Sequence, residues 1–334
     1  MASASGTISR MPAIAAIRAS VLSHLLQQID RKTGKTDILL ATHGILRTQL
    51  DDPYGMVPMA RYVALFEEAA LLTGETALGA RIGTMFQPSD IGPIGVLFSI
   101  SSSIRVGFER LARYVKTVQG ATSSGIFEEH GNLVWSYRLV DPLMWPRRQD
   151  SEFTLAASCQ LVRACFSRSW KPVEVHFEHA GPRTRTALEQ IFRAPLKFGE
   201  SANRIVISGE DAARLYRQED AALAAVLERH IADIAGSAPS PDTISEKVRS
   251  LIGIYIGHRP ITVAAIAADL NCAPRTLQRR LSGEGTSLRD LVREYRRTLA
   301  SLHLQDGDAT MKGIAATLGY ADETVFWRAR RSWR

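Results

Sequence analysis

The chain has 334 residues, a net charge of +7, 45% hydrophobic residues and 22% charged residues. This length suffices for two or three domains, and the composition excludes a disordered or fibrous protein. No stretch approaches the roughly 18 consecutive apolar residues of a membrane helix, and the opening residues MASASGTISR lack the apolar core of a signal peptide. We therefore expect a cytoplasmic protein that does not enter a membrane.

Residues 1–12 have the composition of a flexible tail, and residues 13–235 have the pattern of one α+β domain. Helical periodicity predicts helices over 13–29, 57–72, 104–118, 147–167 and 184–192. Alternation predicts strands over 125–130, 133–140, 173–179 and 204–208, with a hairpin turn at Gly131-Asn132 between the first two.

Several residues of this domain invite a more specific interpretation. An aromatic set either fills the core or lines an effector pocket: Trp135, Tyr137, Trp145, Phe153 and Trp170. The effector-binding residues are otherwise unassigned. His176 and His179 are three apart on a predicted strand, so they point to opposite faces and do not share an ion. Cys159, Cys165 and Cys272 show no metal-ligand spacing. We expect neither a metal nor a cofactor.

The domain is followed by a helix and a linker. The helix covers about 221–234 and is a candidate pairing helix of a homodimer, with one apolar side formed by Leu223, Val226, Leu227, His230, Ile231 and Ile234. Residues 236–242, GSAPSPD, are rich in Gly, Ser and Pro, which is typical of an interdomain linker.

The remaining residues, 243–334, contain a repeat. TVAAIAADLN at 262–271 returns 48 residues later as TMKGIAATLG at 310–319, with five of ten positions identical. Each copy begins with a threonine suited to cap a helix and ends at a turn residue, Asn271 or Gly319. A second, arginine-bearing helix follows each copy, which is the helix-turn-helix plan for entering a DNA major groove. The sequence therefore predicts an all-α domain with two tandem helix-turn-helix units.

A long helix over 287–304 joins the two units. Its apolar positions form one continuous stripe: Leu288, Leu291, Val292, Tyr295, Leu299 and Leu302. About 18 residues span roughly 27 Å, and major-groove faces on one side of DNA recur about every 34 Å. A helix of this length is suited to place two reading helices about one DNA turn apart.

The first reading helix covers 273–281, with Pro274 in its first turn and Leu277 and Leu281 facing the core. The opposite side carries base-reading candidates, since arginine can pair with guanine and glutamine with adenine: Arg275, Gln278 and Arg279. Thr276 and Arg280 lie toward the flanks, where phosphate contacts are expected.

The second reading helix aligns with the first at an offset of 49 residues. Its exposed candidates are Glu323, Thr324, Trp327 and Arg328, with Arg331 as a phosphate contact. Arg330 falls where the first unit has the core residue Leu281. Either Arg330 extends to the surface, or this unit packs loosely and binds DNA less strictly. The acidic pair Asp322-Glu323 repels phosphate, although Glu323 can also accept from a cytosine amino group or cap the helix.

The charge distribution agrees with a DNA-binding C-terminal domain. Residues 241–334 hold 15 Lys and Arg against 10 Asp and Glu, a net +5, whereas the other 240 residues carry only +2. A basic module beside a nearly neutral one is typical of a protein that binds a polyanion through one end.

These residues give the last 90 or so positions a resemblance to the DNA-binding domain of the AraC/XylS family of bacterial transcription regulators. The matching stretches are APRTLQRRL at 273–281, GTSLR at 285–289 and IAATLGYADETVFWRA at 314–329. Residues from about 51 to 208 resemble the family's arabinose-binding, dimerisation-type sensor domain through VPMARY at 57–62, LTGETALG at 72–79, RQDSEF at 148–153 and VHFEH at 175–179.

The resemblance implies that residues 13–235 bind an effector, dimerise, or both. It also implies that the seven base-reading candidates face bases. The sequence departs from the family at two points: Arg330 stands where an aromatic residue is usual, and the family usually continues past Trp333 with a glycine, a proline and an arginine. Because the given sequence ends at Arg334, we expect a shortened second helix-turn-helix unit.

The resulting hypothesis is a sequence-specific regulator, usually an activator, controlled through residues 13–235 by a small effector or by dimerisation. Its expected partners are promoter DNA, RNA polymerase, the effector and a second copy of the chain. We do not expect an enzyme. Two alternatives stay open: an enzyme of the repair methyl-acceptor kind, which needs an activated Cys159 or Cys165, and an architectural protein that binds DNA without sequence preference.

Overall fold

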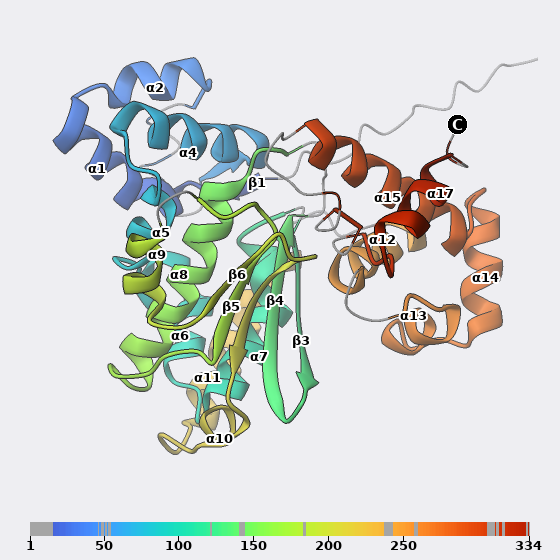
Figure 1. Cartoon of the computed structure of the whole chain (residues 1–334). Coiled ribbons are helices and arrows are strands. Elements are labelled where there is room, and N and C mark those ends of the chain that lie inside the picture. The colour runs from blue at the N-terminus through green and yellow to red at the C-terminus, as the bar shows by residue number, and fades with distance from the viewer. Residues whose placement is uncertain are drawn as a thin grey trace, which may run out of the picture.

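A computed structural model gives the fold and describes residues 16–45, 47, 50, 52, 55–120, 122–139, 144–182, 185–236, 243–256, 260–305, 311, 314–315, 318–331 and 333. The chain forms an α+β part followed by a helical part (Figure 1). The predicted tail 1–12 and residues 237–242 of the predicted linker lie outside the described residues, so those boundaries stay predictions.

The α+β part is built on a five-stranded sheet with the order β3-β4-β7-β5-β6. The strands are β3 Thr122–Glu129, β4 Asn132–Leu139, β5 Glu174–Phe177, β6 Leu196–Phe198 and β7 Asn203–Ile207. All neighbours are antiparallel except β5 and β6, which are parallel. The hairpin turn between β3 and β4 is His130-Gly131, with φ of 50° and 77°, because Glu129 pairs with Asn132. The predicted turn at Gly131-Asn132 was wrong by one residue.

The two faces of the sheet have different neighbours. The front face carries Trp135 and Tyr137 of β4 into the main hydrophobic core, against α7 Ile104–Tyr114 and α8 Arg148–Cys165. The back face carries Val134, Ser136 and Arg138, which are also buried, because α12 Ile244–Tyr255 of the helical part packs against β3 and β4. Strand β4 therefore lies between the core of the first part and the helical part.

The start of the described chain differs from the prediction of one helix over 13–29. Residues Ala16–Arg18 form strand β1, which pairs with β2 Met56–Pro58, and helix α1 begins only at Ser23. The apolar residues of this stretch suit either structure, and pairing with a strand 40 residues away decides in favour of β1.

The other elements of the α+β part surround the core. The helices are α1 Ser23–Thr33, α2 Thr36–Thr42, α4 Met59–Thr73, α5 Leu78–Gly83, α6 Pro93–Ser99, α9 Thr186–Phe192, α10 Gly209–Ala213 and α11 Ala221–Gly236. Three short 3₁₀ turns are η1 Ala19–Leu22, η2 Pro88–Ile91 and η3 Val115–Thr117. None of the helices in the described ranges is long and apolar enough to cross a membrane.

The helical part has its own hydrophobic core, from Val248 to Phe326. Its helices are α12, α13 Val263–Asp269, α14 Pro274–Gly283, α15 Leu288–Gln305 and α17 Glu323–Arg331. The predicted long helix is α15, with Leu288, Leu291 and Tyr295 buried and Val292 half-buried. The side chains of Leu299 and Leu302 lie outside the described residues.

Candidate nucleic-acid interface

The first helix-turn-helix unit consists of α13, a tight turn and α14. The Thr262 hydroxyl accepts a hydrogen bond from the Ala265 backbone N–H at 3.1 Å, so it caps α13 as predicted. Asn271 ends the helix with φ of 49°, a left-handed conformation that Asn tolerates. Pro274 stands in the first turn of α14, where no backbone N–H is needed.

Helix α14 buries one side and exposes the other. Leu277 and Leu281 are buried in the core of the helical part. The base-reading candidates Arg275, Gln278 and Arg279 are exposed, as is Arg280, while Thr276 is half-buried. Successive helical residues are 100° apart, so Arg275 and Arg279 lie opposite the leucines and Arg280 lies at the edge of the buried side. The helix thus presents an arginine-bearing face to solvent.

The second unit repeats the plan. Ile314, Ala315 and Leu318 are buried, and Gly319 has φ of 71° at the position that matches Asn271. Thr310, the predicted first cap, lies outside the described residues. Helix α17 is capped by Asp322, whose carboxylate accepts from the Val325 N–H at 2.8 Å. The capping role considered for Glu323 therefore falls to Asp322.

Helix α17 is anchored by Phe326, which is fully buried. Its candidate residues Glu323, Thr324, Trp327, Arg328 and Arg331 are all exposed.

Arg330 lies at the surface, with its guanidinium carbon 4.8 Å from the centroid of the Trp327 ring. Trp333 is half-buried and packs on Phe326, with the ring centroids 6.1 Å apart. The first of the two possibilities for Arg330, extension to the surface, is the one observed. A stacked arginine also fixes the position of the Trp327 ring.

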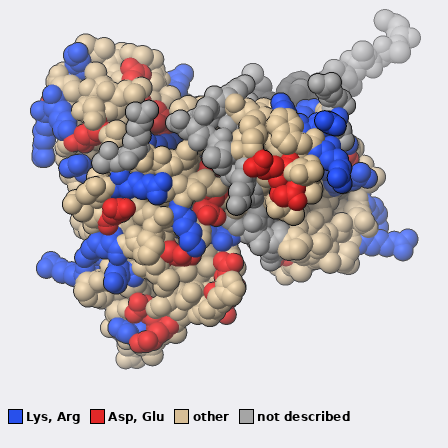
Figure 2. Space-filling model, in the orientation of Figure 1, with Lys and Arg blue, Asp and Glu red and all other residues tan. Residues whose placement is uncertain are grey.

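The second unit is held to α15 by Arg296. Its Nε donates to the Leu318 carbonyl oxygen at 2.9 Å, and its guanidinium carbon is 4.5 Å from the Tyr320 ring centroid. The turn of the second unit is therefore tied to the long helix. Figure 2 shows that Lys and Arg side chains gather over the region of α14 and α17. Such a surface attracts the phosphate backbone of DNA.

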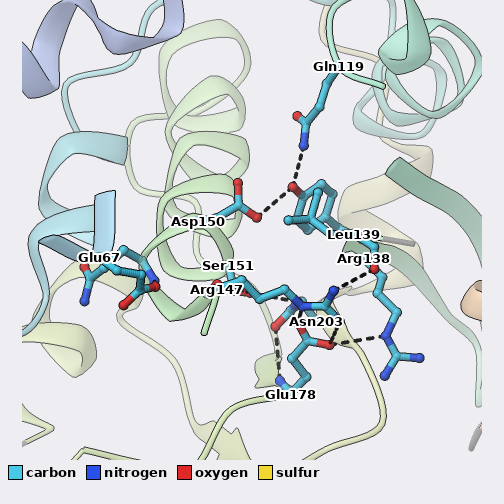
Figure 3. Close-up of polar contacts among 11 residues, drawn as sticks. Glu67, Gln119, Arg138, Leu139, Arg147, Asp150, Ser151, Glu178 and Asn203 are labelled. Atoms are coloured by element: carbon cyan, nitrogen blue, oxygen red, sulfur yellow. Dashed lines mark hydrogen bonds and ion pairs between the residues drawn. The ribbon is translucent and has the colours of Figure 1, made fainter. Parts of the chain in front are cut away.

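A buried charged cluster lies where the two parts of the chain meet. Arg147 donates to Glu178 through Nε at 2.7 Å and through a second nitrogen at 2.9 Å, and Arg138 Nε donates to the same carboxylate at 3.2 Å (Figure 3). Burial lowers the pKa of Arg147, but the attraction of and hydrogen bonds to Glu178, together with Tyr295 and Asp150, outweigh it, and the pKa lies above its ordinary value. The Arg138 guanidinium carbon is 5.8 Å from the ring centroid of Tyr295 on α15. No sequence pattern indicated this cluster.

The cysteines, histidines and aromatic residues named in the sequence analysis lie in the following environments. Burial raises the pKa of Cys159 to about 12 and that of Cys165 to about 11, whereas an activated thiol has a lowered pKa. His176 contacts Glu174 at 2.8 Å, and His179 Nδ1 contacts the Ala180 carbonyl oxygen at 2.8 Å. Of the aromatic set, Trp135, Tyr137 and Phe153 line a cavity, whereas Trp145 and Trp170 lie elsewhere.

Comparison with known proteins gives two family matches. Residues 34–215 match the arabinose-binding N-terminal domain of AraC transcription regulators, and residues 266–334 match a helix-turn-helix domain. The chain is 24% identical over 277 residues to the HTH-type transcriptional regulator VirS of Mycobacterium tuberculosis, covering 82% of this chain and 81% of VirS. It is also 24% identical over 289 residues to the ornithine utilization regulator of Pseudomonas aeruginosa, covering 85% and 84%.

A solved structure, the transcriptional regulator CdpR from Pseudomonas aeruginosa, is 20% identical and covers 89% of this chain and 93% of its own, with a TM-score of 0.41.

Proposed function

Because this chain belongs to the AraC family of DNA-binding transcriptional regulators and carries the family's N-terminal effector-binding domain, we propose that it reads promoter DNA with α14 and α17. The observation that supports this most directly is the pair of capped, core-anchored units that both expose an arginine-bearing second helix. Promoter DNA is the expected target, and the cytoplasm is the compartment in which a bacterial regulator meets it.

Helix α14 is the stronger reader. Arg275 and Arg279 lie on its outward face and offer bidentate donors to guanine, and the exposed Gln278, at the edge of this face opposite Arg280, suits adenine. Thr276 and Arg280 flank this face and bind phosphates, which sets the register of the helix in the groove.

Helix α17 is the second reader. Thr324 and Arg328 face outward, Trp327 offers an apolar edge, and Glu323 accepts from a cytosine amino group. Arg331 binds a phosphate. Because Asp322 and Glu323 repel phosphates at one end of this helix, we expect α17 to contribute less affinity than α14.

The long helix α15 spaces the two readers. Its 18 residues span about 27 Å, and the turn that precedes α17 is attached to it through Arg296. Together with the widths of the two units, this length suits readers placed in successive major grooves on one side of the DNA.

Control of DNA binding lies in the sensor domain. We place there a small-molecule effector and a homodimer contact through α11, where Leu223 is 42% and Val226 is 65% exposed. Only part of the predicted apolar side of α11 is available, since Ile231 is buried and Leu227 packs on the core. As an activator, the bound protein contacts RNA polymerase.

Selection of binding sites from a random double-stranded DNA pool with the full chain tests this function. We expect two enriched blocks about one helical turn apart. A single block means that α17 does not read bases. No enrichment at moderate salt contradicts sequence-specific binding and leaves the architectural alternative.

A further inference from the structure

The sensor domain contains a cavity of about 60 Å³ between α8 and the front face of β4. Trp135 and Tyr137 of β4 form one wall and Phe153 of α8 another. Apolar residues from earlier in the chain line the remaining sides: Ile17, Ile94, Leu111 and Val118. The chain thus builds a partly open, mainly apolar cavity from β1, α6, α7 and the end of η3.

The polar groups on the wall are few, and two of them are already hydrogen-bonded to each other. Gln119 Nε2 donates to the Tyr137 hydroxyl at 2.6 Å, and this hydroxyl donates to Asp150 at 2.9 Å (Figure 3). Thr154 and Ser158 of α8 complete the polar lining. Ser158 is buried and lines the cavity, so its hydroxyl is the group that we assign to a hydrogen bond with an occupant.

The residues that line the cavity determine which class of ligand it can bind. A sugar would bury several hydroxyls, and a charged amino acid would bury two charges, each needing a partner that the apolar walls do not offer. A neutral aliphatic molecule has few polar groups to desolvate when it enters this cavity, and it gains free energy by burying apolar surface. One hydroxyl or carbonyl on it can bond to Ser158.

We propose that this cavity is the effector site and that the effector is a small, neutral, mainly aliphatic molecule with a single hydrogen-bonding group. The effector role rests on the proposed function. The volume limits the buried portion: an engineered cavity of about 150 Å³ binds benzene, so about 60 Å³ accepts a shorter aliphatic group.

The position of β4 connects this site to the DNA-binding domain. Side chains alternate along a strand, so Trp135 and Tyr137 face the cavity while Ser136 and Arg138 face α12 and Tyr295. Because the protein interior is close-packed, a shift of β4 also moves the elements that pack against it. An occupant that displaces β4 therefore changes the contact surface of the helical part.

The probe is 1-butanol, with arabinose as the polar comparison, added to the full chain. Ala157→Leu fills the cavity from α8, and Val115→Phe fills it from the half-buried η3, where the risk of misfolding is smaller. Ala213→Leu is the matched control, because Ala213 is exposed and does not line the cavity. Tm and the affinity for the selected DNA site are measured with and without each probe.

We expect butanol at about five times its Kd to raise Tm by about 2–4 °C in the unaltered chain and in Ala213→Leu, and not in the filled variants. DNA affinity changes about fivefold or more in the same two proteins only. Equal responses in filled and unfilled proteins, a response to arabinose instead, or butanol binding with unchanged DNA affinity each overturn the proposal. Loss of the proposed function is seen separately, as absent sequence preference without any probe.

Discussion

Arg279 and Arg280 are neighbours in the sequence, but they lie on different sides of α14. Arg279 is two residues after the buried Leu277 and therefore points away from the core, whereas Arg280 stands beside the buried Leu281 at the edge of the helix. An arginine that enters the groove can discriminate bases, and one at the edge meets only phosphates.

We expect Arg279→Ala to weaken binding to the best site by about 1–3 kcal/mol and to relax one base position. Arg280→Ala, the matched control, weakens binding to all sequences alike and lowers the slope of log K against log salt by about 1. Binding titrations on the best site and its single-base variants separate these outcomes. A uniform loss for Arg279→Ala makes it a phosphate contact.

Asp150 makes the stability of the sensor domain depend on pH. Burial raises its pKa to about 7, and the hydrogen bond from Tyr137 opposes only part of this shift. Between its ordinary value of 3.8 and about 7, the folded chain holds a proton that the unfolded chain has lost, so stability decreases as pH rises through this window. Burial also raises the pKa of Glu152 to about 7, so this group has the same effect on stability as Asp150. Burial lowers the pKa of His179 from 6.5 to about 4, so between these pH values this group makes stability increase as pH rises.

Asp150→Asn isolates the contribution of this one carboxyl group. Between pH 5.5 and 8, we expect the unfolding free energy of the unaltered chain to fall by on the order of 2 kcal/mol more than that of Asp150→Asn. Urea unfolding at several pH values measures the difference, with the exposed Asp233→Asn as control. Parallel pH profiles for the unaltered chain and Asp150→Asn would show that Asp150 ionises normally.

At the scale of elements, each reading helix depends on the short helix before it. Helix α13 has only seven residues, so packing and its cap hold it in place. The cap is the Thr262 hydroxyl, and the buried pair Ile266 and Ala267 supplies the packing. A weakened α13 loosens the turn that positions α14.

We expect Thr262→Ala to destabilise the DNA-binding domain by about 1 kcal/mol, because one backbone N–H of the first turn loses its partner. Thr262→Ser keeps the hydroxyl and should retain most of this stability. Thermal unfolding of the two variants gives the comparison. If Ser and Ala prove equally destabilising, the threonine methyl group rather than the cap stabilises α13.

Elements with a strong local signal could be predicted from the sequence. The repeat identified α13 and α14 because caps, turns and the apolar stripe are all short-range features. Strand β1 was predicted as helix, since its partner β2 is distant in the chain, and β6 was missed because three residues give no alternation to detect. The sequence of a short strand does not show that it pairs with a strand distant in the chain.

The same limit applies to the sites. The exposed arginines of α14 follow from helical geometry, whereas the Arg138–Glu178–Arg147 cluster joins residues from three separate segments. The cavity was indicated in part by its aromatic residues Trp135 and Tyr137. Its aliphatic walls come from segments that only the tertiary structure brings together.

At the scale of the whole molecule, the sensor domain and the DNA-binding domain share a surface on the back of the sheet. Helix α12 covers β3 and β4, and Tyr295 of α15 lies over Arg138. Arg138 also donates to Glu178, so it contacts both the buried cluster of the sensor and a core residue of the DNA-binding domain. This arginine therefore links the two domains directly.

Arg138→Met keeps the length and the apolar part of the side chain and leaves the Arg147–Glu178 pair intact. We expect this variant to bind DNA with an affinity that no longer changes when the cavity is occupied, because the contact with Tyr295 has lost its charge. Arg185→Met, at an exposed arginine over Phe198, is the control. DNA titrations with and without butanol give the ratio of the two DNA affinities for each protein. If this ratio were as large in Arg138→Met as in the unaltered chain, Arg138 would not transmit the effect of the cavity to the DNA-binding domain.

We propose that one chain reads two successive major grooves through readers spaced by α15. The test compares the affinity for the selected site with that for the same site carrying 5 additional base pairs between its two blocks. Since about 10 base pairs make one turn, this insertion moves the second block to the opposite side of the DNA. We predict that affinity falls to the level of a site with one block. Unchanged affinity would contradict tandem reading by a single chain.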